Sequence, residues 1–508
     1  MSRDRVSGPS GPLFAAVDAG TTGARAVVCG LDGIRLSEKR RRYATVTARP
    51  GWAEQDARAW ASCALEALGA LPATLRARIA AIGLTGQSPS VVAVDASGAP
   101  VAPGMIYRDN RAVEEAAELR SLVGAARIHR VTGHTPEAFH VGPKVLWLRR
   151  HDPRAFARTR WFLQPRDVVL HRLTGTFLTD ESHANCTLFY DLEGHCWADE
   201  IFDAVDLGRV FPDAVPSSTV VGGLAASVAS GVGIRAGTPI VIGAGDSQCV
   251  AYGAGVLSAG PISEMAGASS CLNSAVAAPL DDLRVTHYNH VVAGWYTTEL
   301  GVNTTGSALQ WAVDQLGFAG FEDFAAHADE GTALVLDEQR GGPIDAAPVF
   351  LPYLGDGERD DPTIRAAFVG LSDRHDRRTL AYAVVEGVAA GVASVLDVLK
   401  AAGSPLEELR VSGGGARLDA LGQVKADLLG VPVLHLREDA AGLGVALLAA
   451  AATGHPDEVA VARAGLLQRA TRFEPRRVGS ARLEVRRAWF DDLRRAAALH
   501  LPGHAGHR

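Results

Sequence analysis

The chain has 508 residues, of which 47% are hydrophobic and 21% charged, and its formal net charge at pH 7 is −7. This length predicts more than one domain, and the composition is typical of a globular protein with sizeable cores. A slightly acidic chain of this kind lacks the basic footprint of a nucleic-acid-binding protein, and its longest apolar segment, from Gly442 to Thr453, is too short to span a bilayer.

The N-terminal residues and the cysteines indicate the cellular compartment of the protein. Residues 1–12 are polar and lack the apolar centre of a secretory signal peptide. The six cysteines include no Cys-x-x-Cys pair, and most of them lie in apolar segments, as expected of buried thiols in a reducing compartment. We therefore expect a cytoplasmic protein with no membrane segment and no nucleic-acid partner.

The first stretch with chemical character runs from Asp18 to Arg25 and reads Asp-Ala-Gly-Thr-Thr-Gly-Ala-Arg. Apolar runs at 13–17 and 26–29 predict two strands on either side of this turn. Gly20 and Gly23 permit a sharp turn whose N–H groups point at a ligand, and a carboxylate beside it suits hydrated Mg²⁺. A nucleotide polyphosphate site is one interpretation and an ordinary hairpin is the other, and this segment alone does not decide.

The rest of the first half alternates strands and helices. The pattern predicts a helix at 59–71, strands at 79–84 and 91–95, and a mostly helical stretch at 119–174. A further strand at 239–242 leads into a glycine-rich turn that ends at Asp246. Alternation of this kind favours an α/β architecture in which helices cover a sheet.

The second half begins at a plausible boundary near residues 258–261, and it repeats the opening pattern. A small-residue turn at 267–270 follows an apolar run, which suggests an internally duplicated fold. Beyond it we expect a strand near 350–354, a helix at 378–402, a strand at 409–411, a glycine turn at 413–415, a helix at 418–429 and a strand at 431–434.

Two carboxylates and three glycine-rich turns are what a nucleotide and Mg²⁺ require, although each feature alone has a bland explanation as a tight turn or helix cap. Other nucleotide and metal motifs are absent from the sequence. It contains no Gly-x-x-x-x-Gly-Lys-Ser/Thr, and the run 243–245 lacks the third glycine of a dinucleotide fingerprint. The pair His287 and His290 has no further ligand at a suitable spacing, so a structural role is favoured.

The chain resembles the FGGY family of carbohydrate kinases, of the actin-like ATPase superfamily, over about residues 13 to 455. The ordered matches are Asp18 to Thr22, the Pro-Gly-Trp-x-Glu-Gln-Asp segment at 50–56, Leu173 to Gly175, Thr179-Asp180, 191–197, the Gly-x-Gly-Asp at 243–246, 303–311, 351–353, 357–359, Glu386-Gly387, 413–415, Gln423 and Ala426-Asp427.

This resemblance implies two actin-like (ribonuclease H-like) α/β domains with the active site in the interdomain cleft. The domains would be residues 13–257, which bind the sugar and carry the catalytic group, and 258–480, which bind the nucleotide. ATP and Mg²⁺ would be the cofactors, with Asp246 as general base and Asp18 holding the metal. A homodimer is expected on the resemblance alone.

The resemblance also assigns ligand contacts. The implied nucleotide-binding residues are Gly20, Thr21, Thr22, Arg25, Gly267, Ala268, Ser269, Gly306, Gln310, Gly414 and Gly415. The implied sugar-binding residues are Gln87, Ser88, Tyr107, Asp109 and Asp246.

Three departures from the family pattern affect the expected function. The second phosphate loop has Ala268 where Thr is usual, Ser88-Pro89 replaces the Met-His that faces the sugar in xylulose kinases, and Tyr107 replaces a Trp. We expect ATP-dependent phosphorylation of a terminal hydroxyl of a small sugar, first of all a ketopentose such as D-xylulose. The alternatives are a kinase for another ketose or polyol, such as ribulose, erythritol or glycerol, and a catalytically weakened sugar- or nucleotide-binding switch.

Overall fold

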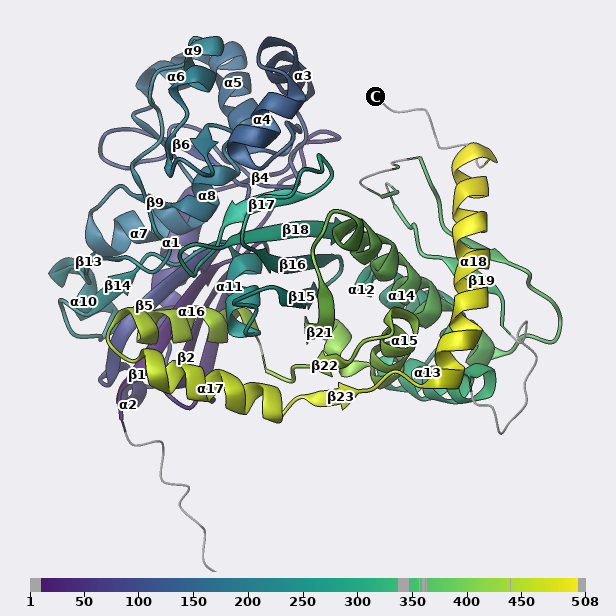
Figure 1. The fold of residues 1–508 in the computed structure, drawn as a ribbon. Helices are drawn as coiled ribbons and strands as arrows, with labels where there is room; N and C mark the ends of the chain where they lie inside the picture. The colour runs from purple at the N-terminus through teal and green to yellow at the C-terminus, as the bar shows by residue number, and fades with distance from the viewer. Residues whose placement is uncertain are drawn as a thin grey trace, which may run out of the picture. The chain divides into compact units, whose positions relative to one another are not determined.

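The computed structural model describes residues 11–336, 347–355, 357–358, 361, 363–438 and 440–500 (Figure 1). Contacts within the chain divide it into two compact units. The first unit comprises the residues before 258 together with 276–298 and 440–466, and the second comprises 258–275, 299–439 and the residues from 467 onward. Two late segments thus return to the first unit, whereas the expected domains 13–257 and 258–480 are each continuous in sequence.

The elements up to residue 257 are β1 (Leu13–Ala19), β2 (Gly23–Gly30), β3 (Arg35–Arg42), β4 (Glu54–Gln55), α1 (Ala57–Gly69), α2 (Ala73–Arg76), β5 (Ile79–Gly86), β6 (Val92–Val94), β7 (Gly104–Met105), α3 (Val113–Leu122), α4 (Ala125–Thr132), α5 (Val141–His151), α6 (Pro153–Arg158), β8 (Trp161–Leu163), α7 (Pro165–Thr174), β9 (Thr179–Asp180), α8 (Glu181–Asn185), β10 (Tyr190–Asp191), β11 (Cys196–Trp197), α9 (Asp199–Ala204), β12 (Ala214–Val215), β13 (Val220–Gly223), α10 (Ala226–Val232), β14 (Pro239–Val241) and α11 (Asp246–Gly253).

The later elements are β15 (Gly260–Ala266), β16 (Ser270–Val276), β17 (Thr286–Asn289), β18 (Tyr296–Val302), α12 (Gly306–Gln315), α13 (Phe321–Leu336), β19 (Val349–Leu351), β20 (Ala367–Val369), α14 (Arg377–Ala401), β21 (Leu406–Gly413), the 3₁₀ turn η1 (Gly414–Arg417), α15 (Asp419–Leu429), β22 (Val433–His435), α16 (Ala440–Ala452), α17 (Pro456–Gln468), β23 (Thr471–Phe473) and α18 (Arg477–His500). The expected α/β architecture is confirmed, and the expected helical stretch 119–174 is interrupted by β8.

The main sheet of the first unit has the strand order β13-β14-β5-β1-β2-β3. Its centre consists of β1, β5 and β14, which run parallel, while β2 is antiparallel to β1. Successive side chains of a strand point to opposite faces, so β5 shows how both faces are covered. Ile82 and Leu84 belong to a core shared with side chains of α1 and α7. The intervening Gly83 lies against Val445 of α16.

Helix α16 explains the apolar segment noted at 442–453 in the sequence. It is a buried core helix that packs on β1, β5 and α11 of the first unit. Glycines permit this close approach: a Cβ on Gly444 would lie 2.0 Å from the carbonyl oxygen of Cys249, and Gly253 faces the backbone of Gly444. The segment therefore serves the first unit although it follows the second in sequence.

In the second unit, neighbouring strands follow the order β16-β15-β21-β22-β23. Strand β15 is antiparallel to β16 and parallel to β21, β21 is parallel to β22, and β22 is antiparallel to β23. Helices α12, α13, α14 and α15 share one apolar core. The long helix expected at 378–402 is α14, capped at its start by Asp376. Mid-helix Gly387 allows close packing, because a Cβ there would meet the carbonyl oxygen of Phe350.

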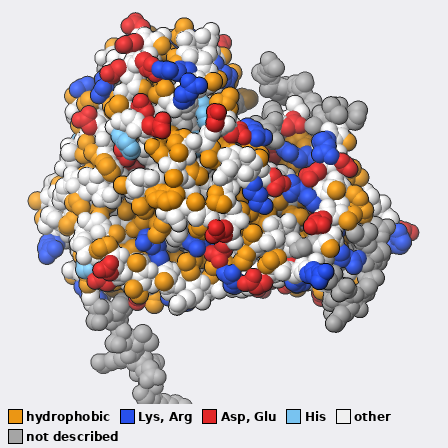
Figure 2. Space-filling model, viewed as in Figure 1, with side chains coloured by type: hydrophobic (Ala, Val, Ile, Leu, Met, Phe, Trp, Pro, Cys, Tyr) orange, Lys and Arg blue, Asp and Glu red, His pale blue; other side chains and the backbone are white. Residues whose placement is uncertain are grey.

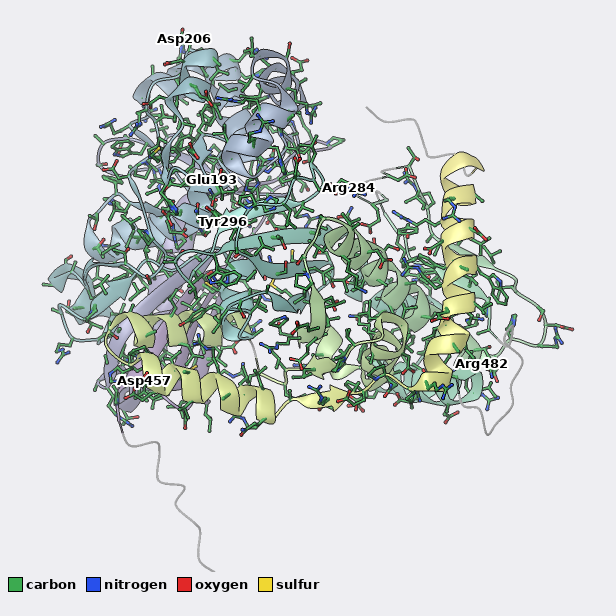
Figure 3. All side chains as sticks on the ribbon, viewed as in Figure 1. Glu193, Asp206, Arg284, Tyr296, Asp457 and Arg482 are labelled. Carbon is green, nitrogen blue, oxygen red and sulfur yellow. The ribbon has the colours of Figure 1, made fainter. Side chains whose placement is uncertain are left out.

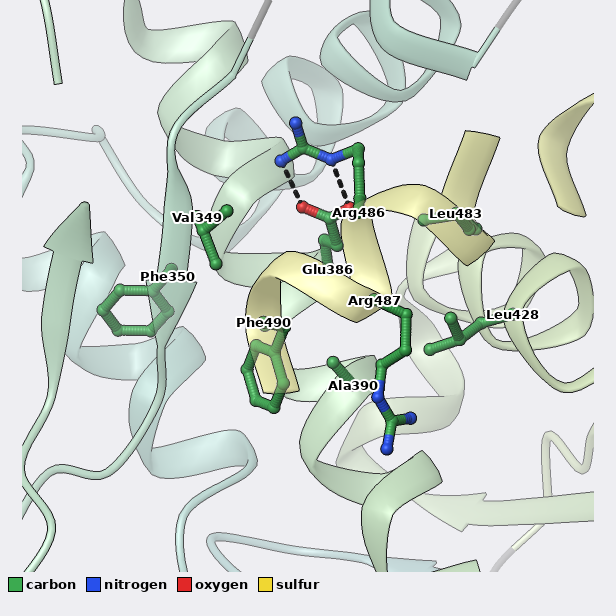
Figure 4. A pocket seen from close by; sticks show the side chains of 10 residues that line it. Val349, Phe350, Glu386, Ala390, Leu428, Leu483, Arg486, Arg487 and Phe490 are labelled. Atoms are coloured by element: carbon green, nitrogen blue, oxygen red, sulfur yellow. Dashed lines mark hydrogen bonds and ion pairs between the residues drawn. The ribbon is translucent and has the colours of Figure 1, made fainter. Parts of the chain in front are cut away.

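The C-terminal helix α18 is fixed to this core by a buried ion pair. The Arg486 guanidinium donates two hydrogen bonds to the Glu386 carboxylate and others to the carbonyl oxygens of Ala347 and Pro348 (Figure 4). Phe490, one turn further along, packs with Val349 in a small apolar cluster. Figure 3, in which Arg482 marks α18, shows the described side chains on the ribbon.

Two features, the charge on the surface and one long apolar helix, bear on the expected partners. On the face shown in Figure 2, basic and acidic side chains are interspersed. Among the described residues, one helix, α14, is long and apolar enough to cross a membrane, and most of that stretch is buried within the protein. Arg359, of the match at 357–359, lies outside the described residues.

Candidate active site

The site in the first unit is built where three parallel strands end side by side. Asp18 lies near the end of β1, opposite Thr85 of the neighbouring β5. Gln87 follows β5, and Asp246 follows β14 after a short turn. Ligands of open α/β sheets bind at the carboxyl ends of parallel strands. Topology therefore places at one sheet edge three residues to which the sequence assigned the metal, the sugar and the catalytic proton.

The loop between β1 and β2 is held through its carbonyl oxygens. Tyr43 donates its hydroxyl hydrogen to the carbonyl oxygen of Gly20, and the Gln55 amide donates to that of Thr21 at 2.8 Å. The Gln87 amide donates to Gln55 at 3.0 Å. Because side chains of the protein donate hydrogen bonds to these carbonyl oxygens, the loop keeps a fixed shape in which its N–H groups can donate to a ligand.

Asp18 and Arg25 form an ion pair within this loop. They face each other across the hairpin, and the Arg25 guanidinium donates to the Asp18 carboxylate at 3.0 Å. Both side chains are mostly buried, with 16% of the Asp18 side chain and 13% of the Arg25 side chain exposed. The expected metal carboxylate and the expected phosphate-binding cation are thus brought together, and Arg25 orients the carboxylate.

The turn that precedes Asp246 is fixed at every residue. Gly243 has φ of +71°, and a Cβ there would lie 1.7 Å from the carbonyl oxygen of Leu84, so only glycine fits. The Thr85 hydroxyl donates to the carbonyl oxygen of Ala244 at 2.8 Å, and the Gly245 N–H donates to the Ser182 hydroxyl at 3.0 Å. Asp246 then begins α11, where the helix dipole stabilises its carboxylate form.

A buried charge network lies beneath this turn. Arg166 is fully buried and donates to the carbonyl oxygen of Gly243 at 3.0 Å and to the Asp180 carboxylate at 2.7 Å. Burial alone would raise the pKa of Asp180, but the Arg166 charge and hydrogen bonds from His183 and Ser182 outweigh it and hold this pKa well below its usual range. Asp180 thus remains a carboxylate and keeps Arg166 in place under the turn.

The segments at 87–90 and 107–111 meet on the same side of the first unit. The Tyr107 N–H donates to the Ser90 hydroxyl at 3.0 Å, and the Ser88 hydroxyl lies 3.0 Å from the Cys186 sulfur and 3.1 Å from the Gln164 amide oxygen. The Tyr107 side chain is 39% exposed, which leaves its ring accessible to a ligand.

Asp109, in contrast, is fully buried and engaged by protein donors. It accepts a hydrogen bond from the Ala53 N–H at 2.7 Å and several from the Arg111 guanidinium. Arg111 in turn stacks on Trp52, with its central carbon 3.4 Å from the ring centroid. The Pro-Gly-Trp-x-Glu-Gln-Asp segment therefore connects the β1–β2 loop to residues 107–111, and Asp109 supports that connection from within.

The second unit brings the remaining predicted residues together around the β15–β16 turn. The N–H groups of Thr305 and Ser307 donate to the Ala268 carbonyl oxygen, and that of Gly306 donates to Gly267. A Cβ on Gly306 would lie 2.2 Å from the same Gly267 oxygen. The start of α12 is thus pressed against the turn, as a shared nucleotide site requires.

The 413–415 turn approaches the same strand end. Gly413 has φ of +90°, and a Cβ on either Gly413 or Gly415 would lie 2.7 Å from an atom of Ala266. Gln310 lies one turn along α12, where it is exposed and donates to Asp314. Gly267, Ala268 and Ser269 are exposed, and the Gly267 N–H donates to the Ser269 carbonyl oxygen at 2.9 Å, which closes a tight turn. The exposed main chain of Ala268 and Ser269 lies open to a ligand.

A buried ion pair supports this turn. Lys425 of α15 pairs with Glu264 of β15 at 2.5 Å, and both side chains are almost completely buried. The Ser270 hydroxyl donates to the Glu264 carboxylate at 2.8 Å and lies 3.1 Å from the Thr305 hydroxyl oxygen. The network therefore links β15, the start of α12 and α15, which contain or lie close in sequence to the predicted nucleotide residues at 267–269, 306, 310 and 414–415.

The residues present fit a nucleotide and one divalent ion. At glycines of the second unit such as Gly306 and Gly413, a Cβ would collide with neighbouring backbone atoms. Backbone without side chains permits the close approach of phosphate or ribose. Among the described residues, no group of three or more His, Cys, Asp or Glu side chains is arranged as a metal site. Mg²⁺ accepts few carboxylates and keeps several waters, so a site with the single carboxylate of Asp18 would suit it.

Sequence reasoning located the loop residues and missed their supports. Tyr43, Gln164, Arg166 and Lys425 carry the hydrogen bonds described above, and each is distant in sequence from its partner. The signal that could have revealed two of them is their type, because Arg166 and Lys425 are charged residues next to apolar positions of their helices.

Comparison with known proteins agrees with this geometry. The model of the N-terminal domain of the FGGY family of carbohydrate kinases matches residues 13–253, and that of the C-terminal domain matches 264–453. The chain is 28% identical over 426 residues to a xylulose kinase of Escherichia coli (strain K12). This aligned region covers 82% of the chain and 85% of that kinase. The chain is 31% identical over 516 residues to a glycerol kinase of Dechloromonas aromatica (strain RCB), covering 96% and 97%.

A solved structure shows the same fold throughout the chain. The xylulose kinase of Rhodospirillum rubrum superposes with a TM-score of 0.86 at 28% identity, covering 95% of this chain and 98% of that one. The matches span both units and include the two loops and the turn before Asp246. The expected resemblance is confirmed: the chain belongs to the FGGY family of carbohydrate kinases.

Proposed function

We propose that the protein transfers a phosphoryl group from ATP to a terminal hydroxyl of a small sugar, with D-xylulose as the first candidate. The observation that carries the proposal is Asp246, a carboxylate on a fully braced turn at the sheet edge that also carries Asp18 and Gln87. The kinases of this family use ATP as phosphate donor. Similarity to xylulose kinases over most of the chain supports the choice of sugar.

Asp246 would act on the acceptor hydroxyl. As the oxygen–phosphorus bond forms, the hydroxyl proton passes to the Asp246 carboxylate, and ADP leaves with the electrons of the bond that breaks. Asp246 stands in the first turn of α11, where the helix dipole favours a negatively charged side chain. The braced turn prevents the carboxylate from drifting, since a misplacement of about 1 Å costs such a reaction about a hundredfold in rate.

The remaining site residues would hold the donor. Asp18 would bind Mg²⁺ through water, and the backbone of Gly20 to Thr22 and of Gly267 to Ser269 would bind phosphate oxygens. Gly306, Gln310, Gly414 and Gly415 would contact the nucleoside. Mg²⁺ would neutralise charge on the phosphates as the transfer proceeds. A cytoplasmic location and a homodimer remain predictions.

Glycerol is the second candidate acceptor. It is favoured by the higher identity, 31%, to a glycerol kinase that matches nearly the whole chain. Ser88 and Pro89 favour neither candidate, because xylulose kinases carry Met-His and glycerol kinases carry Arg-Glu at this place. A switch that binds without turnover is disfavoured by the retained and braced Asp246, because a pure binding protein has no use for a base there.

The test is ADP release from the purified protein with Mg-ATP and a panel of acceptors. The panel contains D-xylulose, L-xylulose, D-ribulose, L-ribulose, erythritol, glycerol and D-fructose, with a reaction lacking acceptor as background. We expect one ketopentose to raise the rate at least about a hundredfold above background. Stimulation by glycerol alone would replace D-xylulose by the second candidate. Binding of ATP with no stimulation by any acceptor would contradict the proposed function.

A further inference from the structure

The chain uses lysine very sparingly. The sequence has 50 Lys and Arg residues, but lysine occurs only at positions 39, 144, 400 and 425. Lys39 and Lys400 are exposed, whereas Lys144 and Lys425 are completely buried. Lysine differs from arginine in carrying a compact charge and in losing its proton readily when buried. A lysine at a buried position in so arginine-rich a chain therefore points to a role that arginine does not fill.

The two buried lysines have different surroundings. Lys425 is paired with the Glu264 carboxylate, so its charge is compensated. Lys144, on α5, instead donates to two main-chain carbonyl oxygens, that of Ile106 at 2.8 Å and that of Pro89 at 3.2 Å. Among the described residues it has no carboxylate within ion-pair distance.

The two carbonyl groups belong to the segments assigned to the sugar. Pro89 lies within the 87–90 turn, directly after Ser88, and Ile106 directly precedes Tyr107. The Tyr107 N–H also donates to Ser90, so the two segments are already neighbours. The Lys144 amine lies behind this junction and holds both chains at once.

The groups that face Lys144 do little to keep it charged. Asp109 is engaged by Arg111 and the Ala53 N–H, and Arg111 itself is a cation. The Cys186 thiol also faces Lys144, and burial raises its pKa to about 12, so it stays neutral. Burial lowers the pKa of Lys144 to about 7, and the smaller opposing effects of Asp109 and Cys186 do not restore it.

We propose that Lys144 is a proton-sensitive positioning residue, whose ammonium form holds the 87–90 turn against the Tyr107 segment and whose deprotonation loosens both. Hydrogen bonds from a charged donor are about twice as strong as those from a neutral one. This inference rests on the proposed sugar kinase function and adds regulation by pH to its sugar-binding half. The affinity for the acceptor falls as the pH rises through 7, while the affinity for ATP is unaffected.

The first experiment measures the protonation of Lys144 directly. The intact protein is labelled with ¹³C at the ε-carbon of lysine, and its four lysine signals are followed by NMR from pH 6 to 10. Loss of one signal in Lys144→Met assigns that residue. We expect the Lys144 signal to titrate near pH 7 and those of Lys39 and Lys400 near pH ~10.4. A Lys144 signal that remains that of an ammonium up to pH 9 would overturn the proposal.

The second experiment measures KM for D-xylulose, or for the panel member with the highest rate, from pH 6.0 to 8.5 at saturating Mg-ATP. We expect this KM to rise about threefold to tenfold across the range, with a smaller change in kcat. Lys144→Met should have a raised KM that no longer depends on pH. Lys400→Met, which alters an exposed lysine, should keep the wild-type profile. Should Lys144→Met not fold, the wild-type KM profile and the NMR titration of wild type, assigned through Lys39→Arg and Lys400→Arg, still decide.

The outcomes separate the two proposals. Acceptor-dependent turnover whose KM is constant from pH 6.0 to 8.5 would contradict the role of Lys144 and leave the kinase function standing. A KM for ATP that follows the same pH profile as the KM for the sugar would also contradict it, because Lys144 contacts only sugar-side segments. Absence of acceptor-dependent turnover at every pH would contradict the kinase function itself.

Discussion

The hairpins that open the two sheets share a frame and differ in their chemistry. Strand β1 is antiparallel to β2 and parallel to β5, and β15 is antiparallel to β16 and parallel to β21. At the equivalent register position, Asp18 lies opposite Arg25 in the first unit, whereas Met265 lies opposite Cys271 in the second. At this register position the duplicated frame therefore carries charge only in its first copy.

The two loops are also braced in different ways. Carbonyl oxygens of the first loop accept hydrogen bonds from the side chains of Tyr43 and Gln55. Those of the second loop accept them from main-chain N–H groups at the start of α12 and from the Ser307 hydroxyl. These hydrogen bonds to Ala268 use its carbonyl oxygen, which gives the unusual side chain at this position less weight than it has in the sequence alone. The first loop, next to the catalytic carboxylate, is the one in which side chains matter.

The largest expected effect comes from removing the charge that the first hairpin carries at this position. Asp18→Asn keeps the shape of the side chain but abolishes its charge, and we expect kcat to fall about a hundredfold or more. The equivalent change in the second hairpin, Met265→Leu, should leave kcat within about twofold. Steady-state ADP release at several Mg²⁺ concentrations measures both. Equal losses in the two variants would mean that the hairpins are not specialised in this way.

The glycines beside the two loops should divide sugar effects from nucleotide effects. Gly306→Ala places a Cβ 2.2 Å from the Gly267 carbonyl oxygen and displaces the second loop, so we expect KM for ATP to rise about tenfold. Gly243→Ala strains the turn before Asp246 and should lower kcat instead. Initial rates with each substrate varied in turn separate the two. An effect of Gly306→Ala confined to the sugar would contradict the assignment of the second loop.

Buried histidines should make the first unit the more acid-sensitive of the two. In the first unit, burial lowers the pKa of His287 to about 3 and that of His290 to about 4, and it holds the pKa of His134 well below 6.5. In the second unit, burial lowers the pKa of His435 to about 3. These imidazoles are neutral when folded but gain protons on unfolding below pH ~6.5, so stability is complete above that pH and falls below it. The loss is about 1.4 kcal/mol per histidine per pH unit.

Hydrogen exchange read by mass spectrometry at pH 7, 5.5 and 4.5 resolves this difference by peptide. Peptides of α4 and β17, corrected for the intrinsic rate, should lose protection before those of α14. His287→Gln should flatten the pH dependence of the first unit, because glutamine has no proton to gain. Simultaneous loss in both units would contradict a local origin in the histidines.

The smallest expected effect comes from restoring the missing hydroxyl of the second loop. Ala268 is exposed, so Ala268→Thr fits without a clash. Because that loop presents its backbone to the ligand, we expect KM for ATP to change by less than about threefold. The matched change in the first loop, Thr21→Ala, should have a larger effect on kcat. A gain of more than tenfold in Ala268→Thr would show that the hydroxyl matters and that the wild type is weakened.

Local pattern predicted much of the fold because the strands are short apolar runs that end in turns. The runs at 13–17 and 79–84 became β1 and β5, and the helix expected at 378–402 is α14. The return of 440–466 to the first unit was not predictable, because an apolar, alanine-rich helix such as α16 fits any sheet. Its glycine contacts with α11 depend on residues almost 200 positions away.

The candidate site divides in the same way. Asp18 and Asp246 could be picked out because each stands at the end of a strand, where sequence order and chemistry coincide. Their supports could not, because Arg166 reaches the Gly243 carbonyl oxygen from 77 residues away. Arg486, which anchors α18, is separated in sequence by 100 residues from its partner Glu386. Pairings of that kind are set by the packed fold and leave no local pattern in the chain.

The central claim is that Asp246 accepts the proton of the acceptor hydroxyl. The test is kcat of Asp246→Asn with the acceptor that the panel identifies, beside Asp457→Asn, which alters an exposed carboxylate in the first turn of α17. We predict a loss of about 10²–10⁴ in kcat for Asp246→Asn, with acceptor and ATP still bound, and no loss for Asp457→Asn. Turnover in Asp246→Asn within about tenfold of the wild type would contradict the account, because no other residue has been given that proton.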